Sequence, residues 1–427
     1  MKFKKNDKVK ISSIGEEATV ISELGNGGQG AVYKVSLNGK EYAMKWYHKP
    51  QKQDFYNNLK NNVSKGTPNK SFLWVLYLTE KVKDNTFGYL MELRPPEYKD
   101  FGQFLLAKEH FASVSAMIEA AVKICTNFRI LHGKGYSYQD LNDGNFFIDP
   151  KTGDVLICDN DNVAPSGINT GIIGKCRYMA PEIVLGNMPN TQSDRYSLSV
   201  ILFLLFFGNH PLEGKQIAET PCMTEKHEKK FYGSAPVFIY DPTDDSNRPV
   251  KGIHNNVINI WKQFPEYVRT AFEKQFSKEM LANPQKRQTE KEWLTTVILR
   301  LRNDLVVCPT CGDENFANNG NFTCGKCCKT FKSPVLVAGK NIIGISSNKK
   351  IFENIINLNS ENYNQISGEF VESKKTSGLF ALRNLTNDTW ILTKKDGSKQ
   401  PVKNGEPAPL LIGNKIEFGN GNFAEIK

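Results

Sequence analysis

The sequence predicts an α+β chain in which a helix-rich middle lies between a β-rich beginning and a β-rich end. Short runs of β-forming residues occur at 9–11, 18–21 and 31–35, before any helical pattern. An apolar run from Leu198 to Phe207 is typical of a buried core helix and is too short to cross a bilayer. From residue 334 onward, short β runs return without long helical periodicity. A length of 427 residues also favours two or three domains.

The composition is that of a globular protein rather than a disordered one, with 39% hydrophobic and 23% charged residues. The net charge is +10, but no block of five or more like charges occurs. We therefore expect a solvated, mildly basic surface and no nucleic-acid groove. Polar residues follow the basic start of the chain, so we expect no signal peptide, no membrane association and a cytoplasmic location.

A glycine-rich segment lies between two expected strands near the beginning of the chain. It follows the pattern G-x-G-x-x-G-x-V, in which glycines let backbone N–H groups approach phosphate oxygens closely. A dinucleotide-binding fold also uses such a segment but requires a helix after the third glycine. Here a β-rich run leads instead to an Asn38-Gly39 hairpin turn, which favours strand–loop–strand. The candidate nucleotide-binding positions are Gly25, Asn26, Gly27, Gly28, Gly30 and Val32.

The next expected strand, 42–46, carries Lys45 among apolar neighbours, where a solvated lysine is unexpected. An edge-strand lysine is the alternative interpretation. A helix is expected over 53–63, with apolar residues on one face. This helix contains no glutamate, and Asp54 is the only acidic residue between positions 42 and 79. Strands are expected next at 72–78 and 87–93.

A polar stretch with Asp140 and Asn145 precedes the apolar run 146–148. A second apolar run, 155–158, ends at Asp159, so the pattern predicts a loop, a hairpin and an acidic residue at the end of its second strand. Two carboxylates and an amide can then meet in one site. Phosphoryl transfer needs such a set, to orient a hydroxyl and to bind Mg²⁺. On its own the pattern also fits a polar surface loop.

The order of these segments resembles that of eukaryotic-type protein kinases. Residues 138–145 resemble the catalytic loop H-R-D-L-x-x-x-N, and Asp159 corresponds to the first residue of D-F-G. Residues 174–182 resemble the G-T-x-x-Y-M-A-P-E end of an activation segment. Residues 193–198 and 283–289 resemble D-x-x-S-x-G and N-P-x-x-R-x-T. Helices are expected at 101–107 and 113–132, between the expected strand at 87–93 and the catalytic loop.

The resemblance implies a bilobal protein-kinase fold over residues 1–305, with an N-lobe of about 1–94 and a C-lobe of about 95–305. It implies that Asp140 is the catalytic base, that Asn145 and Asp159 bind Mg²⁺, and that Lys45 places the phosphates of ATP. It also implies that Asp194 braces the catalytic-loop backbone and that Arg287 pairs with Glu182. The implied adenine-side positions are Ala43, the gatekeeper Met91, and the hinge residues Glu92 to Arg94, which present backbone groups to adenine.

One departure from the family pattern concerns switching. Tyr138-Gln139 replaces His-Arg, and an arginine at the second position neutralises activation-loop phosphate in many kinases. We therefore expect activity that does not depend strongly on phosphorylation of Ser166 or Thr170.

Two further departures concern the lysine partner and the metal. Asn58 lies where the family has the helix glutamate, so the ion pair with Lys45 is lost, replaced by an amide contact, or moved. Asn160-Asp161 replaces Phe-Gly, which is expected to restrict the usual flip of this segment. Asp161 is interpreted as a solvated turn carboxylate or, alternatively, as a further metal ligand.

The segment 306–333 contains a C-x₂-C-x₁₂-C-x₂-C pattern, formed by Cys308, Cys311, Cys324 and Cys327. Tight turns place four thiolates where they converge tetrahedrally on Zn²⁺, so the pattern predicts a structural zinc ribbon. Disulfides or redox chemistry are the alternatives. Cys328 is a bystander or a replacement for Cys327.

The last segment, 334–427, predicts a small β-sandwich. Residues 410–419 resemble the L-x-x-G-D-x-I-x-L-G segment of forkhead-associated domains. At 344–345 and 366–370 the two arginines that grip a phosphate in that family are absent. A docking module that does not read phosphothreonine is favoured over one that does.

A kinase joined to a zinc ribbon and a forkhead-associated-like end resembles the bacterial kinases of TerY-type phosphorylation triads, a family associated with stress response. The segment 233–242 adds to this resemblance. It implies a von Willebrand A-domain protein and a metal-dependent phosphatase as partners, beside a protein substrate.

The sequence therefore predicts an ATP-dependent serine/threonine kinase that acts on a partner or on itself. A pseudokinase scaffold that binds nucleotide and recruits partners is the alternative. A nucleic-acid-binding zinc ribbon is a third hypothesis, but it lacks a basic stripe with interleaved aromatic residues.

Overall fold

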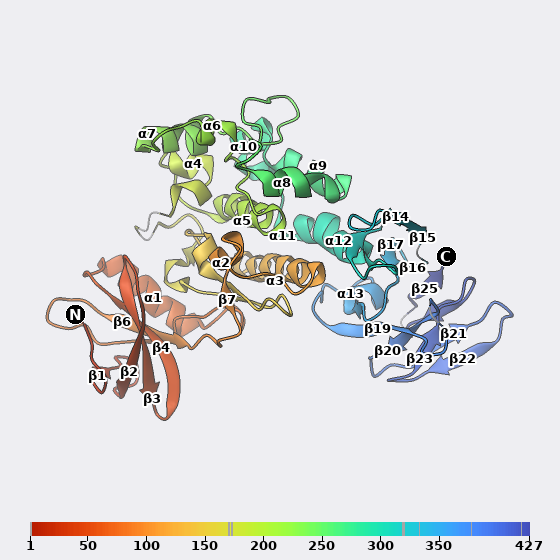
Figure 1. Cartoon of the computed structure of the whole chain (residues 1–427). Helices are drawn as coiled ribbons and strands as arrows, with labels where there is room; N and C mark the ends of the chain where they lie inside the picture. Colours follow the sequence, from red (N-terminus) through yellow and green to blue (C-terminus); the bar gives the residue numbers. More distant parts are fainter. Residues whose placement is uncertain are drawn as a thin grey trace. The chain divides into compact units, whose positions relative to one another are not determined.

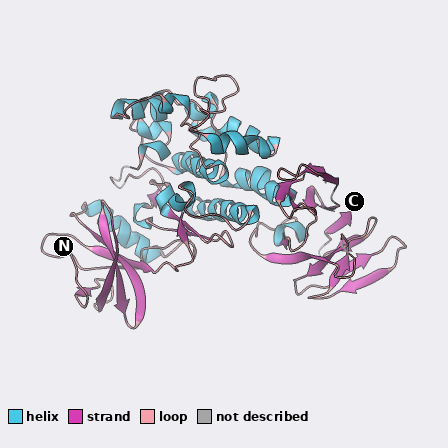
Figure 2. Cartoon of the chain, viewed as in Figure 1, coloured by secondary structure: helices cyan, strands magenta, loops and turns pink. Residues whose placement is uncertain are grey.

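The computed structural model describes residues 2–169, 171, 174–317, 321–332, 334–376, 378–419 and 421–427. The chain divides into two compact units. The first comprises Met1–Ala112, Ile124–Ile260 and Thr270–Lys291, and the second comprises Ser113–Lys123, Trp261–Arg269 and Glu292–Lys427. Strands concentrate towards the two ends of the sequence and helices in its middle, as Figure 2 shows.

An antiparallel sheet and one helix open the first unit (Figure 1). The strands are β1 (Lys8–Lys10), β2 (Glu17–Asn26), β3 (Gly30–Leu37), β4 (Lys40–Tyr47), β5 (Tyr77–Leu78) and β6 (Gly88–Glu92). Their order in the sheet is β1-β2-β3-β4-β6-β5. Asn38 and Gly39 both have positive φ at the β3–β4 turn, which confirms the predicted hairpin. Helix α1 (Gln53–Lys65) buries Phe55 and Leu59 and ends at Gly66.

The strand predicted over 72–78 is largely wrong, because only its last two residues form β5. The backbone of this segment bonds to two different parts of the chain instead of one ladder. The N–H of Leu73 donates to the carbonyl of Ile157, whereas that of Leu76 donates to Leu90. Most of its apolar side chains, from Phe72 to Val75, are buried all the same, so hydrophobicity alone did not distinguish this path from a strand.

The helical part of the chain includes a long buried helix, α5 (Thr191–Phe207). Asn190 caps its start by accepting from the backbone N–H groups of Gln192 and Ser193, and Gly208 ends it in the left-handed region. The other helices are α2 (Phe101–Leu105), α3 (Val114–Gly133), α4 (Pro181–Val184), α6 (Lys215–Ala218), α7 (Glu225–Glu228), α8 (Asn255–Ile260), α9 (Glu266–Gln275), α10 (Lys278–Ala282), α11 (Glu290–Glu292) and α12 (Leu299–Asp304).

Short strands frame the polar stretch singled out in the sequence. They are β7 (Lys99–Asp100), β8 (Tyr136–Ser137), β9 (Phe146–Ile148), β10 (Val155–Ile157) and β11 (Ala164–Pro165). Strands β9 and β10 form the predicted hairpin, which β7 extends to the order β10-β9-β7. Strand β8 pairs with β11, so the polar stretch runs from one small sheet to the other.

Two hairpins carry the clustered cysteines of the second unit. Strand β12 (Leu305–Val307) pairs with β13 (Glu314–Phe316), and β14 (Asn321–Thr323) pairs with β15 (Thr330–Lys332). Each hairpin turn holds one Cys-x₂-Cys pair.

Two sheets share one core at the carboxyl-terminal end of the second unit. The strands are β16 (Val335–Ala338), β17 (Asn341–Gly344), β18 (Lys350–Phe352), β19 (Ile366–Glu372), β20 (Phe380–Asn384), β21 (Trp390–Thr393), β22 (Lys399–Val402), β23 (Pro407–Pro409), β24 (Lys415–Glu417) and β25 (Phe423–Ile426), with one short helix, α13 (Glu353–Ile356). Their orders are β17-β16-β25-β24-β21-β22 and β18-β19-β20-β23. Leu336 and Trp390 of the first sheet and Phe370 and Leu382 of the second belong to one buried cluster.

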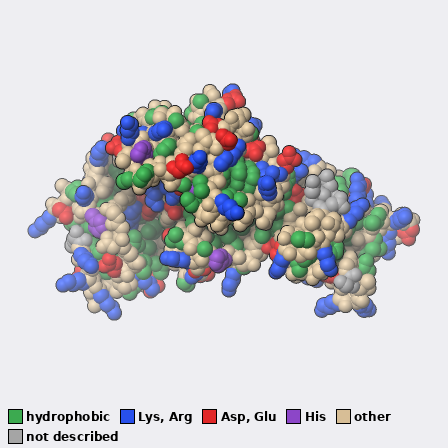
Figure 3. Space-filling model, turned by 45° about the horizontal axis from the view of Figure 1, so that its top comes forward, with side chains coloured by type: hydrophobic (Ala, Val, Ile, Leu, Met, Phe, Trp, Pro, Cys, Tyr) green, Lys and Arg blue, Asp and Glu red, His purple; other side chains and the backbone are tan. Residues whose placement is uncertain are grey.

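Among the described residues, no helix is long and apolar enough to cross a membrane. Figure 3 shows lysine and arginine side chains scattered over the visible face among acidic and neutral ones.

Candidate functional site

The polar stretch between β8 and β9 brings Asp140 and Asn145 together. The Asn145 amide nitrogen donates to the Asp140 backbone carbonyl at 2.6 Å. The Asn142 amide nitrogen donates to Asp140 Oδ1 at 3.1 Å, which orients that carboxylate. Burial raises the pKa of Asp140 above its usual value, the Asn142 hydrogen bond opposes this shift, and the negative charge of Asp159 adds to it.

Asp194, near the start of α5, holds the backbone of this stretch. Its Oδ2 accepts from the N–H of Tyr138 at 2.6 Å and its Oδ1 from that of Gln139 at 3.1 Å. This confirms that Asp194 braces the loop. The Tyr138 hydroxyl donates to the carbonyl of Cys158, the residue before Asp159. Tyr138 therefore joins the loop to the end of β10.

Asp159 follows β10 in a left-handed backbone conformation, with φ 51° and ψ 39°. The N–H of Cys158 donates to the Asn145 carbonyl at 3.0 Å, so the ends of the two segments are connected directly. Lys45 in β4 reaches Asp159 Oδ1 at 3.3 Å. All four residues predicted as catalytic, Asp140, Asn145, Asp159 and Lys45, thus lie in one connected network.

The nearer partner of Lys45 is Asp161, whose Oδ2 lies 2.9 Å from Lys45 Nζ. The Asp161 side chain is fully buried, and the same oxygen accepts from the Tyr47 hydroxyl at 2.6 Å. The interpretation of Asp161 as a solvated turn carboxylate is therefore wrong. It failed because a turn was assumed to face solvent, whereas β4 covers this one. Burial alone lowers the pKa of Lys45, but Asp161 and Asp159 outweigh burial and raise it above its usual value.

Helix α1 contacts the same segment through amides. The side-chain nitrogens of Asn58 and Asn62 both donate to the Val163 carbonyl at 2.8 Å. Of the three outcomes left open for the lysine partner, the structure therefore has the ion pair moved to Asp161, with amide contacts between α1 and the segment.

Two of the predicted adenine-side residues, Ala43 and Met91, belong to one apolar cluster. Ala43 of β4 and Met91 of β6 are cross-strand partners. Val32 of β3 packs against the same cluster, which also contains Leu156 of β10. Glu92 is exposed and pairs with Lys40 at 3.0 Å.

The remaining predicted nucleotide positions differ in their surroundings. The Arg94 guanidinium lies 4.1 Å from the centre of the Phe147 ring. Asn26 Oδ1 lies 3.0 Å from His48 Nε2. A Cβ atom added to Gly25 or Gly28 would meet no atom within 4 Å, and one on Gly27 would meet its nearest atom at 3.8 Å. Space is therefore present where side chains would begin at these three positions, although the Gly27 N–H donates to the Gly30 carbonyl at 2.9 Å. Gly30 is different, because its Cβ would lie 2.4 Å from the Trp46 carbonyl oxygen.

Gln139 contacts the segment after Asp159 without a charge. Its amide nitrogen donates to the Ile168 carbonyl at 2.6 Å. Thr170, predicted as one of two phosphorylation positions, lies outside the described residues. Further along, Arg287 binds Glu182 through two contacts of 2.7 Å, which confirms the predicted ion pair.

The four predicted zinc ligands converge in the second unit. The sulfur atoms of Cys308, Cys311, Cys324 and Cys327 all lie within 4.8 Å of one another. Cys328 is exposed and has positive φ. Four thiolates of this arrangement fit a closed tetrahedral Zn²⁺ site.

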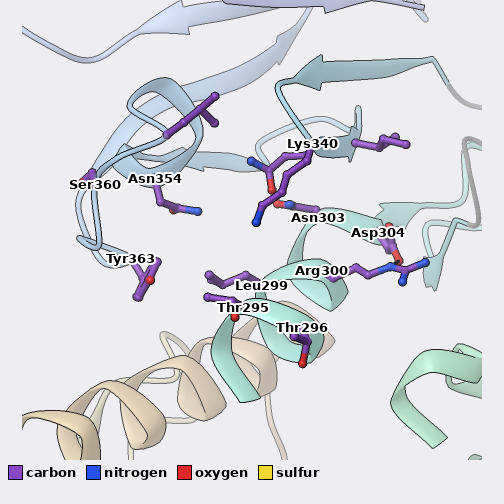
Figure 4. Close-up of a pocket in the computed structure, with 13 residues that line it drawn as sticks. Thr295, Thr296, Leu299, Arg300, Asn303, Asp304, Lys340, Asn354, Ser360 and Tyr363 are labelled. Carbon is purple, nitrogen blue, oxygen red and sulfur yellow. Dashed lines mark ion pairs between the residues drawn. The ribbon is translucent and has the colours of Figure 1, made fainter. Parts of the chain in front are cut away.

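A separate cavity of about 760 Å³ lies in the second unit (Figure 4). Hydroxyl and amide groups line it together with the cations Arg300 and Lys340, from α12 and from the β16–β17 turn. None of the predicted nucleotide or metal positions belongs to its lining.

Sequence reasoning missed Tyr47, Asn142 and Leu156, and it misjudged Asp161. Asn142 was detectable, since an amide two residues after a candidate base can reach its carboxylate. Tyr47 and Asp161 are 114 residues apart, so their contact leaves no local pattern.

Comparison with known proteins gives the following similarities. A family model described as protein kinase domain matches residues 18–297. Protein kinase C delta type of Rattus norvegicus is 29% identical over 209 residues, which cover 47% of this chain and 30% of that protein. A probable serine/threonine-protein kinase of Dictyostelium discoideum is 25% identical over 235 residues, 52% of this chain and 14% of that protein. The cAMP-dependent protein kinase catalytic subunit-like protein of Caenorhabditis briggsae is 26% identical over 161 residues, 38% of this chain and 40% of that protein. The matches span less than half the length of each of these relatives.

Proposed function

The chain belongs to the protein kinase domain family, and we propose that it is an active kinase that transfers the γ-phosphate of Mg-ATP to serine or threonine hydroxyls of a partner or of itself. Names of similar proteins, serine/threonine kinases among them, support this choice of acceptor.

The network of four residues carries the proposal. Asp140 accepts the hydrogen bond of the attacking hydroxyl and takes up its proton as phosphate is transferred. Asn145 and Asp159 would hold Mg²⁺ through their side-chain oxygens, and the ion would supply positive charge to the phosphates. Lys45 and the glycine-rich segment that contains Gly25, Gly27 and Gly28 place the phosphates. The cluster around Ala43 and Met91 receives the adenine, with hydrogen bonds from the backbone of 92–94.

The test is transfer of radiolabelled γ-phosphate to the protein, to generic substrates and to co-expressed neighbours. We expect Asp140→Ala to lower the rate by about 10² to 10⁴, since it removes the general base. Absence of transfer by the wild type to all these acceptors would contradict the proposal.

A pseudokinase scaffold is the alternative. The absence of a glutamate from α1 favours it, as does the replacement of Phe-Gly after Asp159. The retention of Asp140, Asn145, Asp159 and Lys45 favours the enzyme, because a scaffold has no need for all four. A protein that binds ATP without transferring phosphate would identify the scaffold.

For the rest of the chain we propose a kinase domain over 1–305, a zinc ribbon over 306–333 and a forkhead-associated-like β-sandwich over 334–427. The converging thiolates support the ribbon. Measurement of bound zinc tests it: we expect one equivalent in the wild type and a loss of this zinc in Cys308→Ser. The shared core of the two sheets supports the sandwich.

We further propose that the tail, residues 306–427, docks partners without reading phosphothreonine. By resemblance, the partners are a von Willebrand A-domain protein and a metal-dependent phosphatase in the cytoplasm. Co-purification with the tail present and absent tests this, and unchanged partners without the tail would contradict it.

A further inference from the structure

The ammonium of Lys45 binds the carboxylate of Asp161. This residue lies neither in β3 or β6, the strands next to β4, nor in α1. Asp161 comes from the 3₁₀ turn Asn160–Asn162, and its Oδ2 accepts from both Lys45 Nζ, at 2.9 Å, and the Tyr47 hydroxyl, at 2.6 Å. Lys45 is 5% exposed and Asp161 is fully buried. A buried charge pair with a supporting hydrogen bond has little freedom to rearrange.

Helix α1 has no carboxylate for this purpose. Asp54 is its only acidic residue, and it is exposed in the first turn of the helix. The two asparagines on the face towards the segment, Asn58 and Asn62, use their amide nitrogens on the Val163 carbonyl.

The 3₁₀ turn is also anchored by contacts that do not involve α1. The buried Asn160 amide donates to the carbonyls of Leu73, at 2.9 Å, and Ile157, at 2.8 Å. The turn that carries Asp161 is therefore attached to the same hairpin that presents Asp159.

We propose that Asp161 is the positioning residue of Lys45: it holds the ammonium where the α- and β-phosphates of ATP bind, so that this position does not depend on movement of α1. This inference rests on the proposed function. It assigns to Asp161 the task that a helix carboxylate performs in the kinase mechanism, and it excludes a role as a further Mg²⁺ ligand.

A double-mutant cycle on ATP affinity tests the proposal without requiring catalysis. We expect Asp161→Asn and Lys45→Met each to raise the Kd for ATP about tenfold, and the double variant to bind within about threefold of Lys45→Met alone. Wild-type affinity in Asp161→Asn, or effects of the two substitutions that multiply, would overturn it. Thermal unfolding of each variant establishes that it is folded at the temperature of measurement.

The metal alternative is separated by repeating the titration with EDTA. A lysine-positioning role predicts that Asp161→Asn binds metal-free ATP more weakly than the wild type as well. A defect confined to samples with Mg²⁺ would overturn the proposal in favour of a metal ligand.

Asp241→Asn is the matched control. Asp241 is also buried in the first unit, but within the described residues its carboxylate accepts hydrogen bonds from the backbone N–H and the hydroxyl of Thr243. We expect unchanged ATP affinity. If Asp161→Asn does not fold, Tyr47→Phe removes the supporting hydroxyl and keeps the ion pair. We then expect a Kd about threefold higher, and an unchanged Kd would overturn the proposal.

Phosphate transfer is measured in parallel. A wild type that binds ATP with the expected coupling but transfers no phosphate would contradict the proposed function and leave the positioning role intact. If the wild type transfers phosphate but the effects of Asp161→Asn and Lys45→Met on ATP affinity are independent, the positioning role is contradicted and the proposed function stands.

Discussion

At the scale of single residues, a buried histidine supports the catalytic loop through the aspartate that braces it. His132 Nε2 lies 3.0 Å from Asp194 Oδ2, and its Nδ1 lies 2.9 Å from Glu290 Oε1. Arg195 also binds Glu290, at 3.0 Å. Burial alone lowers the pKa of His132, but hydrogen bonds to the two carboxylates outweigh it and raise the pKa to about 9. The protonated ring thus compensates the charge of Asp194.

The contacts of His132 with Asp194 and Glu290 make the free energy of unfolding depend on pH in a defined window. Because the pKa of His132 rises from 6.5 to about 9 on folding, its contribution is fully present below pH 6.5 and is lost as the pH rises through 9. We expect the wild type to lose on the order of 3 kcal/mol of unfolding free energy across this window relative to His132→Gln. Denaturant unfolding from pH 6 to 10 measures it, and parallel curves for the two proteins would contradict it.

Among single residues, roles that depend on a short motif could be predicted from the sequence, whereas contacts between distant positions could not. The bracing role of Asp194 follows from a short motif. The contact of His132 with Glu290 joins positions 158 residues apart, and only packing of the helices brings them together. The pairing of Lys45 with Asp161 belongs to the same class, which is why the sequence left its partner open.

At the scale of elements, the glycine-rich segment combines two different requirements. Gly28 has open space where a side chain would begin, so packing does not require its lack of Cβ, and under the proposed function this space admits the phosphates of ATP. Gly30 begins β3 opposite Tyr47 and is tightly packed against the carbonyl of Trp46, so its lack of Cβ serves the sheet. The sequence predicted this strand–loop–strand unit, but it could not separate the two roles, because both appear as glycine.

This difference predicts two outcomes for one substitution. We expect Gly30→Ala to cost about 2 kcal/mol of unfolding free energy, because backbone must move to relieve the clash. Gly28→Ala should change stability by less than about 0.5 kcal/mol but should raise the Kd for ATP severalfold. Thermal unfolding and ATP titration of both variants provide the comparison. Equal stability of the two would contradict the packing argument.

At the scale of the whole molecule, motifs in the correct order predicted the kinase fold, although each motif alone was ambiguous. Long elements such as α5 were predictable from their apolar length. The path of residues 72–76 was not, because its backbone partners belong to two distant segments.

For the whole molecule, we expect the catalytic network of the proposed kinase to work without a phosphorylated activation segment. Gln139 makes a neutral contact with Ile168 where many kinases use an arginine, so a phosphate has less to bind. Lys45 has its carboxylate in Asp161, so α1 does not have to move to supply one.

The most direct test starts from phosphatase-treated protein whose mass shows no bound phosphate. Its transfer of radiolabelled γ-phosphate to an added protein substrate is followed from the first seconds, beside Asp140→Ala and Ser166→Ala. We expect a linear time course without lag for the wild type and for Ser166→Ala, and no transfer above background for Asp140→Ala. A lag that disappears after preincubation with ATP, or a loss of activity in Ser166→Ala, would contradict it.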